Sequence, residues 1–388
     1  MKLFGLYINK KSKVFENLSL LFILSILSYF LVFSNSNFKI MSDILDIFIS
    51  IILPSLFPFI LFSNILIYSN YFNLIVNTKL SKVIKKFFRT SDYGTSAIIF
   101  GFLFGYPNGA RYVNELYESK KISFKEAEYL LLFVNNSSPA FVLSSVGIGM
   151  FQNIRIGVLL LLSHVVSSVI IGILYRKKYN LNHNVTQNKE KNTATKDYNI
   201  NFEIIAKSIT KSIYTMCIIF GFMVIFILLY NYVYTFFNYL LNLNENFSCY
   251  MLNVFELTSG LKKLANLPIN LKSLLVLLSF FLGFSSLSIN FQLYSCVYKN
   301  SFKLKNILKG KILQGIISAA ITYILVNVDI IYENINISNI VSYNIQTKYM
   351  LNSYISPFTT YALIFCIYVL LFCILKKETT KKSFLKGG

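Results

Sequence analysis

Long apolar runs, separated by short polar stretches, dominate the chain. Each run approaches or exceeds the roughly 20 residues that a helix needs to cross the hydrocarbon core of a bilayer. The runs are Asn17–Phe33, Ile44–Tyr68, Tyr129–Phe151, Ile154–Tyr175, Ser212–Leu241, Leu271–Phe284, Ile307–Val326 and Phe358–Leu375. This pattern predicts about eight to ten spanning or re-entrant helices, with no room for a soluble enzyme domain between them.

Four apolar segments are interrupted by polar and small residues. The interruptions are Gly105-Tyr106-Pro107-Asn108-Gly109, Asn135-Asn136-Ser137-Ser138-Pro139, Glu256-Leu257-Thr258-Ser259-Gly260 and Gly283-Phe284-Ser285-Ser286-Leu287-Ser288. Because unpaired backbone groups are costly in hydrocarbon, a broken helix is tolerated only where protein buries it or where it lines a wet cavity. The hinges that we expect at these breaks are Gly105, Pro107, Gly109, Pro139, Gly260 and Gly283.

Each break also has the features of a helix start. Pro107 and Pro139 suit the first helical position, where a missing N–H is harmless. Ser138, Ser259 and Ser286 are expected N-caps. The new half-helices would aim free N–H groups into the membrane, which is how secondary transporters hold polar or anionic substrates. Pro54 and Pro58, by contrast, predict only kinks in a packed helix.

Two charged residues lie next to the breaks. An ionisable group inside a membrane is costly and is therefore a candidate for function. Arg111 either takes part in a site or pairs with Glu115 one turn further along. Glu256, which has apolar neighbours, either takes part in binding and coupling or caps a helix at the interface.

The overall composition agrees with a polytopic membrane protein. The 388 residues are 55% hydrophobic and 14% charged, with a mean hydropathy of +0.58. The net charge of +21 comes from basic clusters at segment ends, such as Lys79 to Arg89, Lys299 to Lys311 and Lys376 to Lys386. That distribution follows the positive-inside rule, places both termini in the cytoplasm and argues against a nucleic-acid surface.

The chain divides into five parts. We expect an uncleaved membrane helix over residues 1–40, since no cleavage site of the A-x-A type follows its apolar run. A first membrane half then covers 41–175, a polar cytoplasmic linker 176–211, a second membrane half 212–375 and a basic cytoplasmic tail 376–388.

The two halves show a weak internal repeat. An offset of 178 residues places Gly105 on Gly283, Lys121 on Lys299, and 123–125 on 301–303. We interpret this as a duplication, and charge alone does not decide between a parallel and an inverted repeat.

The chain offers no catalytic or metal-binding motif. Its five cysteines are scattered, and His164 and His183 have no metal-binding neighbours, so we predict no enzyme, metal or cofactor. His164 is expected to be a structural histidine.

The segments around the breaks resemble the family of sporulation integral membrane proteins called YlbJ or SpoVV, whose members carry Gate, or nucleoside recognition, domains. The matching stretches are GFLFGYPNGARYVNEL, KEAEYLLLFVNNSSPAFVLSSVGIGMF, FELTSGL, GFSSLSINFQLYS and LKGKILQGIISAAIT, in family order from about residue 44 to 375. The chain departs from the family at Asn290, where members usually carry a histidine.

The resemblance implies a fold and a function. The fold would be an all-α polytopic membrane protein with two repeat-related halves and discontinuous or re-entrant helices, similar to the Gate domains of concentrative nucleoside transporters. The function would be secondary transport of dipicolinate, a small planar dianion, across the outer forespore membrane of a spore-forming bacterium, driven by a proton or sodium gradient.

Polar residues at the breaks are the expected substrate ligands. They are Asn108, Arg111, Asn135, Asn136, Ser137, Ser138, Ser286, Ser288, Asn290 and Gln292, with Glu256, Thr258 and Ser259 in binding or coupling. Two alternatives remain open at this stage: transport of a nucleoside or another polar metabolite, and a non-transporting component that assembles sporulation machinery. The expected partners are the lipid bilayer and the small-molecule substrate, without nucleic acid, and the sequence leaves the oligomeric state undetermined.

Overall fold

A computed structural model describes residues 19–71, 78–179 and 200–327 of the chain. Within these ranges the regular structure is helical and contains no strand, as expected for an all-α membrane protein. A first helix covers Ser19–Val32. The remaining elements are α2 (Ser34–Ile47), the π-helix η1 (Phe48–Ile52), α3 (Leu53–Tyr68), α5 (Lys79–Phe88), α6 (Asp92–Phe104), α7 (Asn108–Glu118), α8 (Phe124–Leu131), the π-helix η2 (Phe141–Met150), α9 (Ile154–Tyr179), α10 (Phe202–Leu241), α11 (Glu245–Phe255), α12 (Leu257–Ala265), α13 (Leu271–Phe284), α14 (Ser286–Val297), the 3-10 turn η3 (Tyr298–Asn300) and α15 (Leu304–Asn327).

Many helix starts are fixed by a polar side chain just ahead of the apolar run. Ser91 accepts a hydrogen bond from the backbone N–H of Gly94, and Ser123 accepts one from Glu126. Asn201 and Asn244 cap α10 and α11 in the same way. These caps satisfy N–H groups that would otherwise lack a partner at the first turn.

Five helical stretches among the described residues are long and apolar enough to cross a membrane. They are Ser34–Tyr68, Ile154–Tyr179, Phe202–Leu241, Leu271–Asn300 and Leu304–Asn327. Shorter apolar helices cover Ser19–Val32, Asp92–Phe104 and Phe141–Met150. The predicted segment Phe358–Leu375 and the basic tail 376–388 lie outside the described residues. The chain is therefore a multi-pass, all-helical membrane protein.

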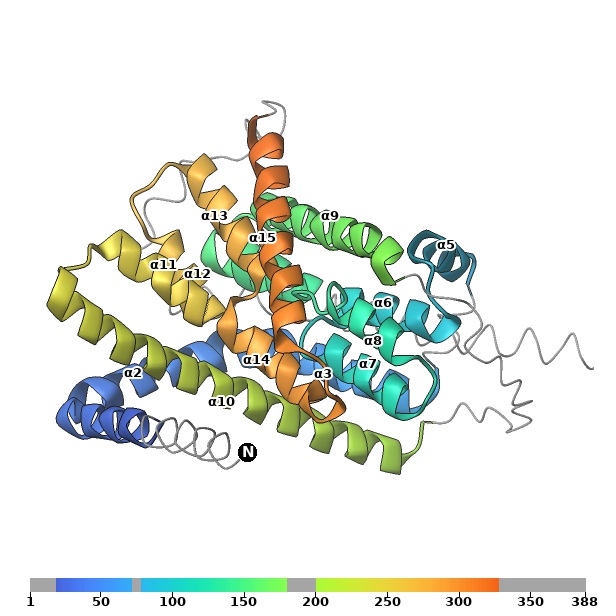
Figure 1. Cartoon of the computed structure of the whole chain (residues 1–388), viewed down its shortest axis with the longest axis horizontal. Coiled ribbons are helices and arrows are strands. Elements are labelled where there is room, and N and C mark those ends of the chain that lie inside the picture. Colours follow the sequence, from blue (N-terminus) through green and yellow to red (C-terminus); the bar gives the residue numbers. More distant parts are fainter. Residues whose placement is uncertain (1–18, 72–77, 180–199, 328–388) are drawn as a thin grey trace, which may run out of the picture.

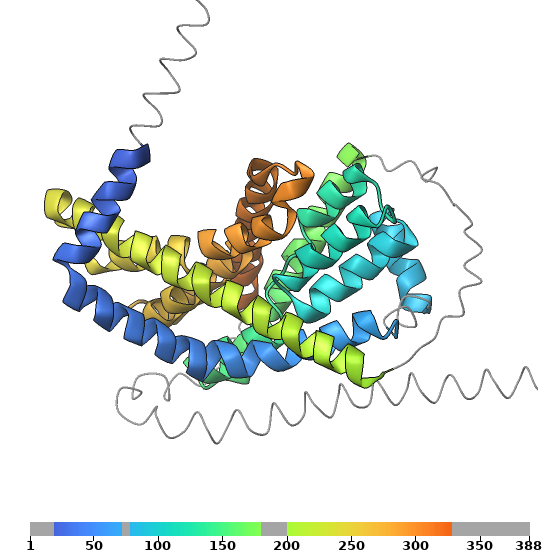
Figure 2. The same ribbon diagram turned by 90° about the horizontal axis from the view of Figure 1, so that it is seen from below.

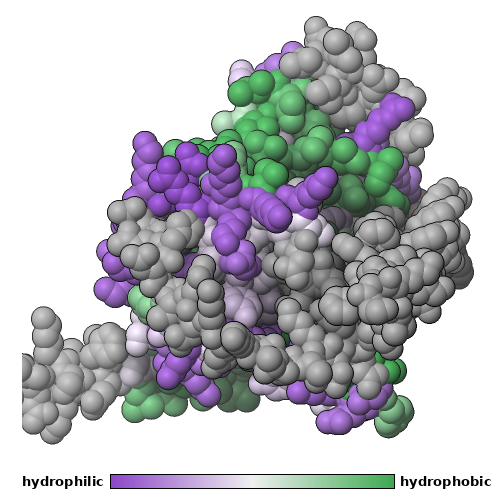
Figure 3. Space-filling view, turned by 90° about the vertical axis from the view of Figure 1, so that its right-hand side faces the viewer, coloured by the Kyte–Doolittle hydropathy of each residue, from purple (hydrophilic) through white to green (hydrophobic). Residues whose placement is uncertain are grey.

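The outer helix faces carry the apolar side chains that such a protein turns toward lipid. Leu162 on α9, Ile225 on α10 and Ile316 on α15 are each more than half exposed. Figure 3 shows hydrophobic side chains gathered on the upper part of one face, above a zone of hydrophilic ones.

Pro54 and Pro58 do not break their helix, as the sequence predicts. Pro54 lies in the first turn of α3 and Pro58 inside it, and α2, η1 and α3 form one continuous helical stretch. The π-helical turn η1 lies just ahead of Pro54.

The helices form two layers that cross, one containing α13 and α15 and the other containing α10 and the α2–α3 stretch (Figure 1 and Figure 2). In Figure 1, α15 runs upright through the centre with α13 packed beside it. The long α10 lies across the lower part, and Figure 2 shows that it crosses the α2–α3 stretch. Phe48 contacts Phe220, and Asn64 donates to Ser212, so α3 and α10 run antiparallel.

The buried apolar side chains form two separate clusters. One contains Leu56 of α3, Val142 of η2 and Leu275 of α13, together with the buried face of α10. The other contains Phe100 of α6, Val113 of α7 and the stretch 129–134. Several elements, including α9, contribute residues to both clusters at different points along their length. The residues between the two clusters therefore form a layer through the molecule.

Two features differ from the sequence prediction. The linker expected over 176–211 is shorter, because α9 continues to Tyr179 and α10 begins at Phe202. The basic loop expected over Lys299 to Lys311 ends earlier, because α15 begins at Leu304 and Lys311 lies inside it, fully buried. In both places a helix extends through residues whose charge pattern suggested a loop.

Candidate functional site

The first predicted break separates α6 from α7. Gly105 has a φ of 67°, and a Cβ there would lie 2.6 Å from the backbone nitrogen of Ser138, so the position requires glycine. The N–H of Tyr106 donates to the carbonyl of Asn136 at 2.8 Å, which joins this break to the second. Pro107 lies just before α7 and not at its first position.

The second break runs through Asn135, Asn136 and Ser137, which have no regular secondary structure. Ser138 accepts from the N–H of Phe141 at 3.2 Å, which confirms its predicted capping role ahead of η2. The N–H of Ser137 donates to Nε2 of His164 at 3.1 Å. His164 therefore supports the break from α9, in keeping with a structural role.

The third break is the junction of α11 and α12 at Glu256. The Glu256 carboxylate accepts from the N–H groups of Thr258 and Ser259 at 2.9 and 2.7 Å. The structure therefore shows a helix cap, and Glu256 is buried in the protein. Its role in binding or coupling remains a prediction. The prediction that Ser259 caps this helix was wrong, because its N–H is one of the groups that Glu256 caps. At the hinge, a Cβ on Gly260 would lie 2.6 Å from Asn253.

The fourth break joins α13 to α14 through two residues with positive φ, Ser285 at 65° and Ser286 at 46°. The predicted N-cap role of Ser286 was wrong, because Ser285 occupies the N-cap position of α14. The Ser285 side chain accepts no capping hydrogen bond, and the Ser286 hydroxyl has no hydrogen-bond partner among the described residues. Asn290 instead donates to the carbonyls of Phe284 and Ser286 at 2.9 and 2.5 Å. Its amide thus joins the end of α13 to the first turn of α14.

The breaks lie close to one another. The first two lie where the two apolar clusters adjoin, since Phe104 and Val134 belong to one cluster and Tyr106 and Phe141 to the other. α12, which begins at the third break, packs against η2 and α14, which follow the second and fourth breaks. A Cβ on Gly109 would lie 3.0 Å from the carbonyl of Val134, and one on Gly283 would lie 3.0 Å from the carbonyl of Gln314. The first two breaks thus contact each other directly, and the fourth contacts α15.

A buried polar network on α15 was missed by sequence reasoning. Gln314 donates to Oδ1 of Asn136 at 2.9 Å, and the ammonium of Lys311 donates to Gln314 at 2.8 Å and to the carbonyl of Asn135. Asn136 donates in turn to Ser168 and to Phe133. The sequence did contain a signal for this network. Lys311 and Gln314 are three residues apart ahead of an apolar helical stretch, and this spacing places their side chains on one face.

Arg111 connects α7 to the crossing helices. Its guanidinium donates to Thr215 of α10 at 3.1 Å and to the side chain of Asn64 on α3. Its Nε lies 3.7 Å from the Glu115 carboxylate. The predicted pairing with Glu115 is therefore present, together with two contacts that join distant parts of the chain.

Several predicted ligands are buried without an internal partner. The polar side-chain atoms without a hydrogen bond include both atoms of Asn108, both atoms of Asn135, the hydroxyls of Ser259, Ser286 and Ser288, Oδ1 of Asn290 and Oε1 of Gln292. Buried polar groups are normally paired with protein or water, so a concentration of unpaired ones is the usual mark of a site for water or a polar ligand. The role of these residues as substrate ligands remains a prediction.

The described residues bring no group of three or more His, Cys, Asp or Glu side chains together in a way that could hold a metal ion. Cys217, Cys249 and Cys296 are free thiols.

Comparison with known proteins gives one informative match. No protein-family model matches the chain, and no solved structure matches it. The curated sporulation integral membrane protein YlbJ of Bacillus subtilis (strain 168) is 24% identical over 353 residues, which cover 80% of this chain and 84% of that protein. Together with the resemblance at the broken segments and the multi-pass helical fold, this similarity supports membership of the chain in the YlbJ family of sporulation integral membrane proteins.

Proposed function

We propose that the chain is a secondary transporter of a small organic anion, dipicolinate, in the outer forespore membrane of a spore-forming bacterium, with both termini in the cytoplasm. The observation that carries the proposal is the group of neighbouring helix breaks, where buried amides and hydroxyls have no hydrogen-bond partner among the described residues. Secondary transporters bind substrate at such discontinuous helices near the middle of the membrane.

The available groups suit a planar dianion. The amides of Asn108 and Asn135 and the hydroxyls of Ser286 and Ser288 are hydrogen-bond donors without acceptors among the residues that the structure describes. Hydrogen bonds from such donors to a carboxylate are charge-assisted and roughly twice as strong as neutral ones. A carboxylate can therefore recover the free energy that these groups lose by leaving water.

We further propose that the two halves are repeats of one unit, similar to Gate domains. Three contacts join residues that are 178 positions apart, the offset found in the sequence: Phe124 stacks on Phe302, Glu128 accepts from Asn306, and Asn136 accepts from Gln314. Equivalent residues meet in this way along a two-fold axis. Because residue number rises in the same direction on both sides of these pairs, α8 and α15 run parallel at this axis.

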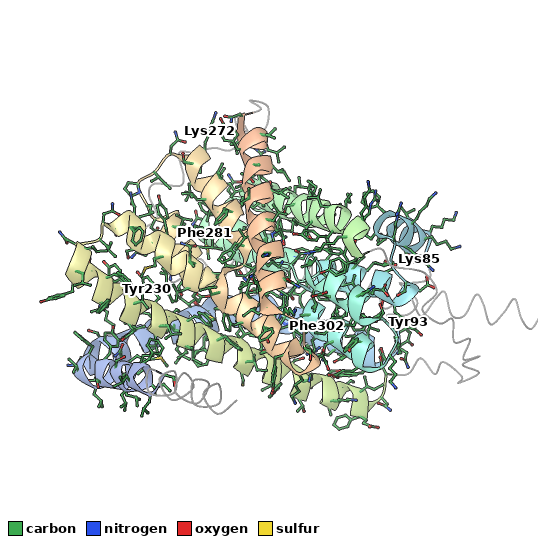
Figure 4. The ribbon with its side chains drawn as sticks, in the orientation of Figure 1. Lys85, Tyr93, Tyr230, Lys272, Phe281 and Phe302 are labelled. Atoms are coloured by element: carbon green, nitrogen blue, oxygen red, sulfur yellow. The ribbon has the colours of Figure 1, made fainter. Side chains whose placement is uncertain are left out.

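The helix order supports the same duplication. Adding 178 to the bounds of α6 and α7 gives 270–282 and 286–296, close to α13 and α14. In Figure 4, Phe302 lies at the lower end of α15, where it meets the first half. Rocking of one half against the other around the polar layer would expose the site alternately to the two sides of the membrane.

Uptake of labelled dipicolinate into proteoliposomes, with and without a pH or sodium gradient, tests the proposal. Wild type should show saturable uptake that depends on one of the gradients. Asn108→Ala and Asn135→Ala remove side chains without internal hydrogen bonds, so both variants should stay folded and lose most uptake. Asn266→Ala, at the exposed end of α12, is the matched control and should transport normally. Unchanged uptake in both site variants would contradict the site.

The test also separates the alternatives. Uptake of labelled nucleosides, with no uptake of dipicolinate, would favour a nucleoside transporter, for which Asn290 in the family's histidine position is the residue to examine. An assembly component would transport neither substrate. In that case deletion within 180–199 would abolish sporulation function, whereas a transporter should tolerate it.

A further inference from the structure

Lys311 is a fully buried lysine in the interior of a helix. It lies on α15, and none of its surface is exposed. Lys305 and Lys309, on the same helix, are exposed and lie where a basic cluster is expected. Burial of an ammonium group in a protein interior costs several kcal/mol unless hydrogen bonds and an opposite charge compensate.

The hydrogen-bond partners of Lys311 within the described residues are neutral. Its ammonium donates to the carbonyl of Asn135 and to Oε1 of Gln314 at 2.8 Å. The ion pairs found in that part of the chain are Lys85 with Asp92 and Arg111 with Glu115, so no carboxylate there pairs with Lys311. His164 lies close enough to feel the charge of Lys311, and a protonated His164 would add repulsion and not compensation.

The surroundings of Lys311 contain the unpaired groups of the candidate site. Asn135, whose carbonyl accepts from the ammonium, has a buried amide without a partner. Gln314, the second partner of Lys311, contacts Gly283 at the start of the fourth break. The same break contains Ser286 and Ser288, whose hydroxyls are unpaired. A cation without a counter-charge thus lies among donors without acceptors.

Arg111 is a poorer candidate for the same role. Its guanidinium already donates to Asn64 and Thr215, and the Glu115 carboxylate balances its charge.

We propose that Lys311 is a substrate-binding residue whose ammonium pairs with a carboxylate of the bound ligand, which makes a small carboxylate, and not a neutral metabolite, the substrate class of this site. The inference rests on the proposed function, because it assigns the charge at the same site. The ligand carboxylate would provide the opposite charge that the protein itself does not supply, and the unpaired donors nearby would bind its remaining oxygens.

Equilibrium binding to the purified full-length protein tests this assignment. The probes are labelled dipicolinate and its neutral diamide, pyridine-2,6-dicarboxamide, and the variants are Lys311→Met, Lys311→Gln and the exposed control Lys309→Met. Wild type and Lys309→Met should bind the dianion in preference to the diamide. Both Lys311 variants should bind dipicolinate about 10- to 100-fold more weakly and lose that preference, as expected when a hydrogen bond to a charged group is removed.

Thermal unfolding without ligand provides the second measurement. Lys311→Met removes an uncompensated buried charge, so its unfolding temperature should equal or exceed that of wild type. The proposal is overturned if dipicolinate binds both Lys311 variants as tightly as wild type, or if both probes weaken by the same factor. It is also overturned if neither variant folds, since Lys311 would then be structural. If wild type binds no carboxylate at all, the proposed function itself fails.

Discussion

Single residues set how closely the helices approach at the breaks. A Cβ on Gly283 would lie 2.8 Å from the Cα of Gly315, and one on Gly315 would lie 2.8 Å from the carbonyl oxygen of Phe280. Both contacts are with backbone, which cannot move aside as a flexible side chain does. Close packing of α13 against α15 therefore requires glycine at both positions.

Gly283→Ala should lower the free energy of unfolding by about 1–3 kcal/mol, the usual cost of overpacking. Gly221→Ala on α10 is the control, because nothing lies within 4 Å of its added Cβ. That variant should be neutral or slightly stabilising, since alanine favours a helix over glycine by about 0.5–1 kcal/mol. Thermal unfolding in detergent compares the two, and equal midpoints would contradict the packing argument.

Arg111→Lys should destabilise the protein although it conserves charge. The planar guanidinium reaches Asn64 and Thr215 at once, and a lysine ammonium does not reproduce that fork. We expect a loss of about 1.5–3 kcal/mol in the free energy of unfolding, the value of one hydrogen bond to a charged group. Denaturant titration measures it, and unchanged stability would show that the contacts to α3 and α10 contribute nothing.

At the scale of elements, the breaks are stabilised by different means. Ser138 caps η2 through its hydroxyl, Glu256 caps α12 through its carboxylate, and Asn290 binds the carbonyls at the start of α14 from within that helix. Sequence analysis identified all four interruptions and the capping role of Ser138, because proline, glycine and serine have strong local preferences. It assigned the other caps wrongly, since the choice among neighbouring polar side chains depends on which one the packing buries.

Glu256→Ala should weaken the start of α12 more than Asn244→Ala weakens the start of α11. Both residues cap a helix, but Glu256 is buried and accepts two N–H groups, whereas Asn244 is exposed and accepts one. Loss of an exposed cap typically costs about 1 kcal/mol, and the buried N–H groups at Glu256 would add a desolvation penalty. Hydrogen exchange at Thr258 and Ser259 should accelerate in Glu256→Ala, and unchanged protection of these amides would contradict the capping role.

At the scale of the whole molecule, contacts between the halves should control transport. Asn300 donates to the side chain of Asn114 at 2.7 Å, a contact between η3 and α7. In a variant whose five native cysteines are replaced by serine or alanine, Asn114→Cys and Asn300→Cys should be bridged by a short reversible cross-linker. If the halves rock, bridging should stop uptake, spare dipicolinate binding and be reversed by reduction.

The corresponding single-cysteine variants control for modification alone and should transport normally after treatment. Full uptake by completely cross-linked protein would exclude rocking at this contact. Partial uptake that follows the uncross-linked fraction would agree with the proposal.

The sequence by itself determined the all-helical membrane class and the positions of the four breaks, because hydropathy and helix-breaking residues act locally along the chain. Only the tertiary structure decided which polar groups are paired. It placed Lys311 in the interior although its neighbours form a basic cluster, joined Arg111 to Asn64 and Thr215, and left Asn108 and Asn135 without partners. The physical reason is that burial and hydrogen bonding depend on residues far apart in sequence, such as Asn136 and Gln314, which only packing brings together.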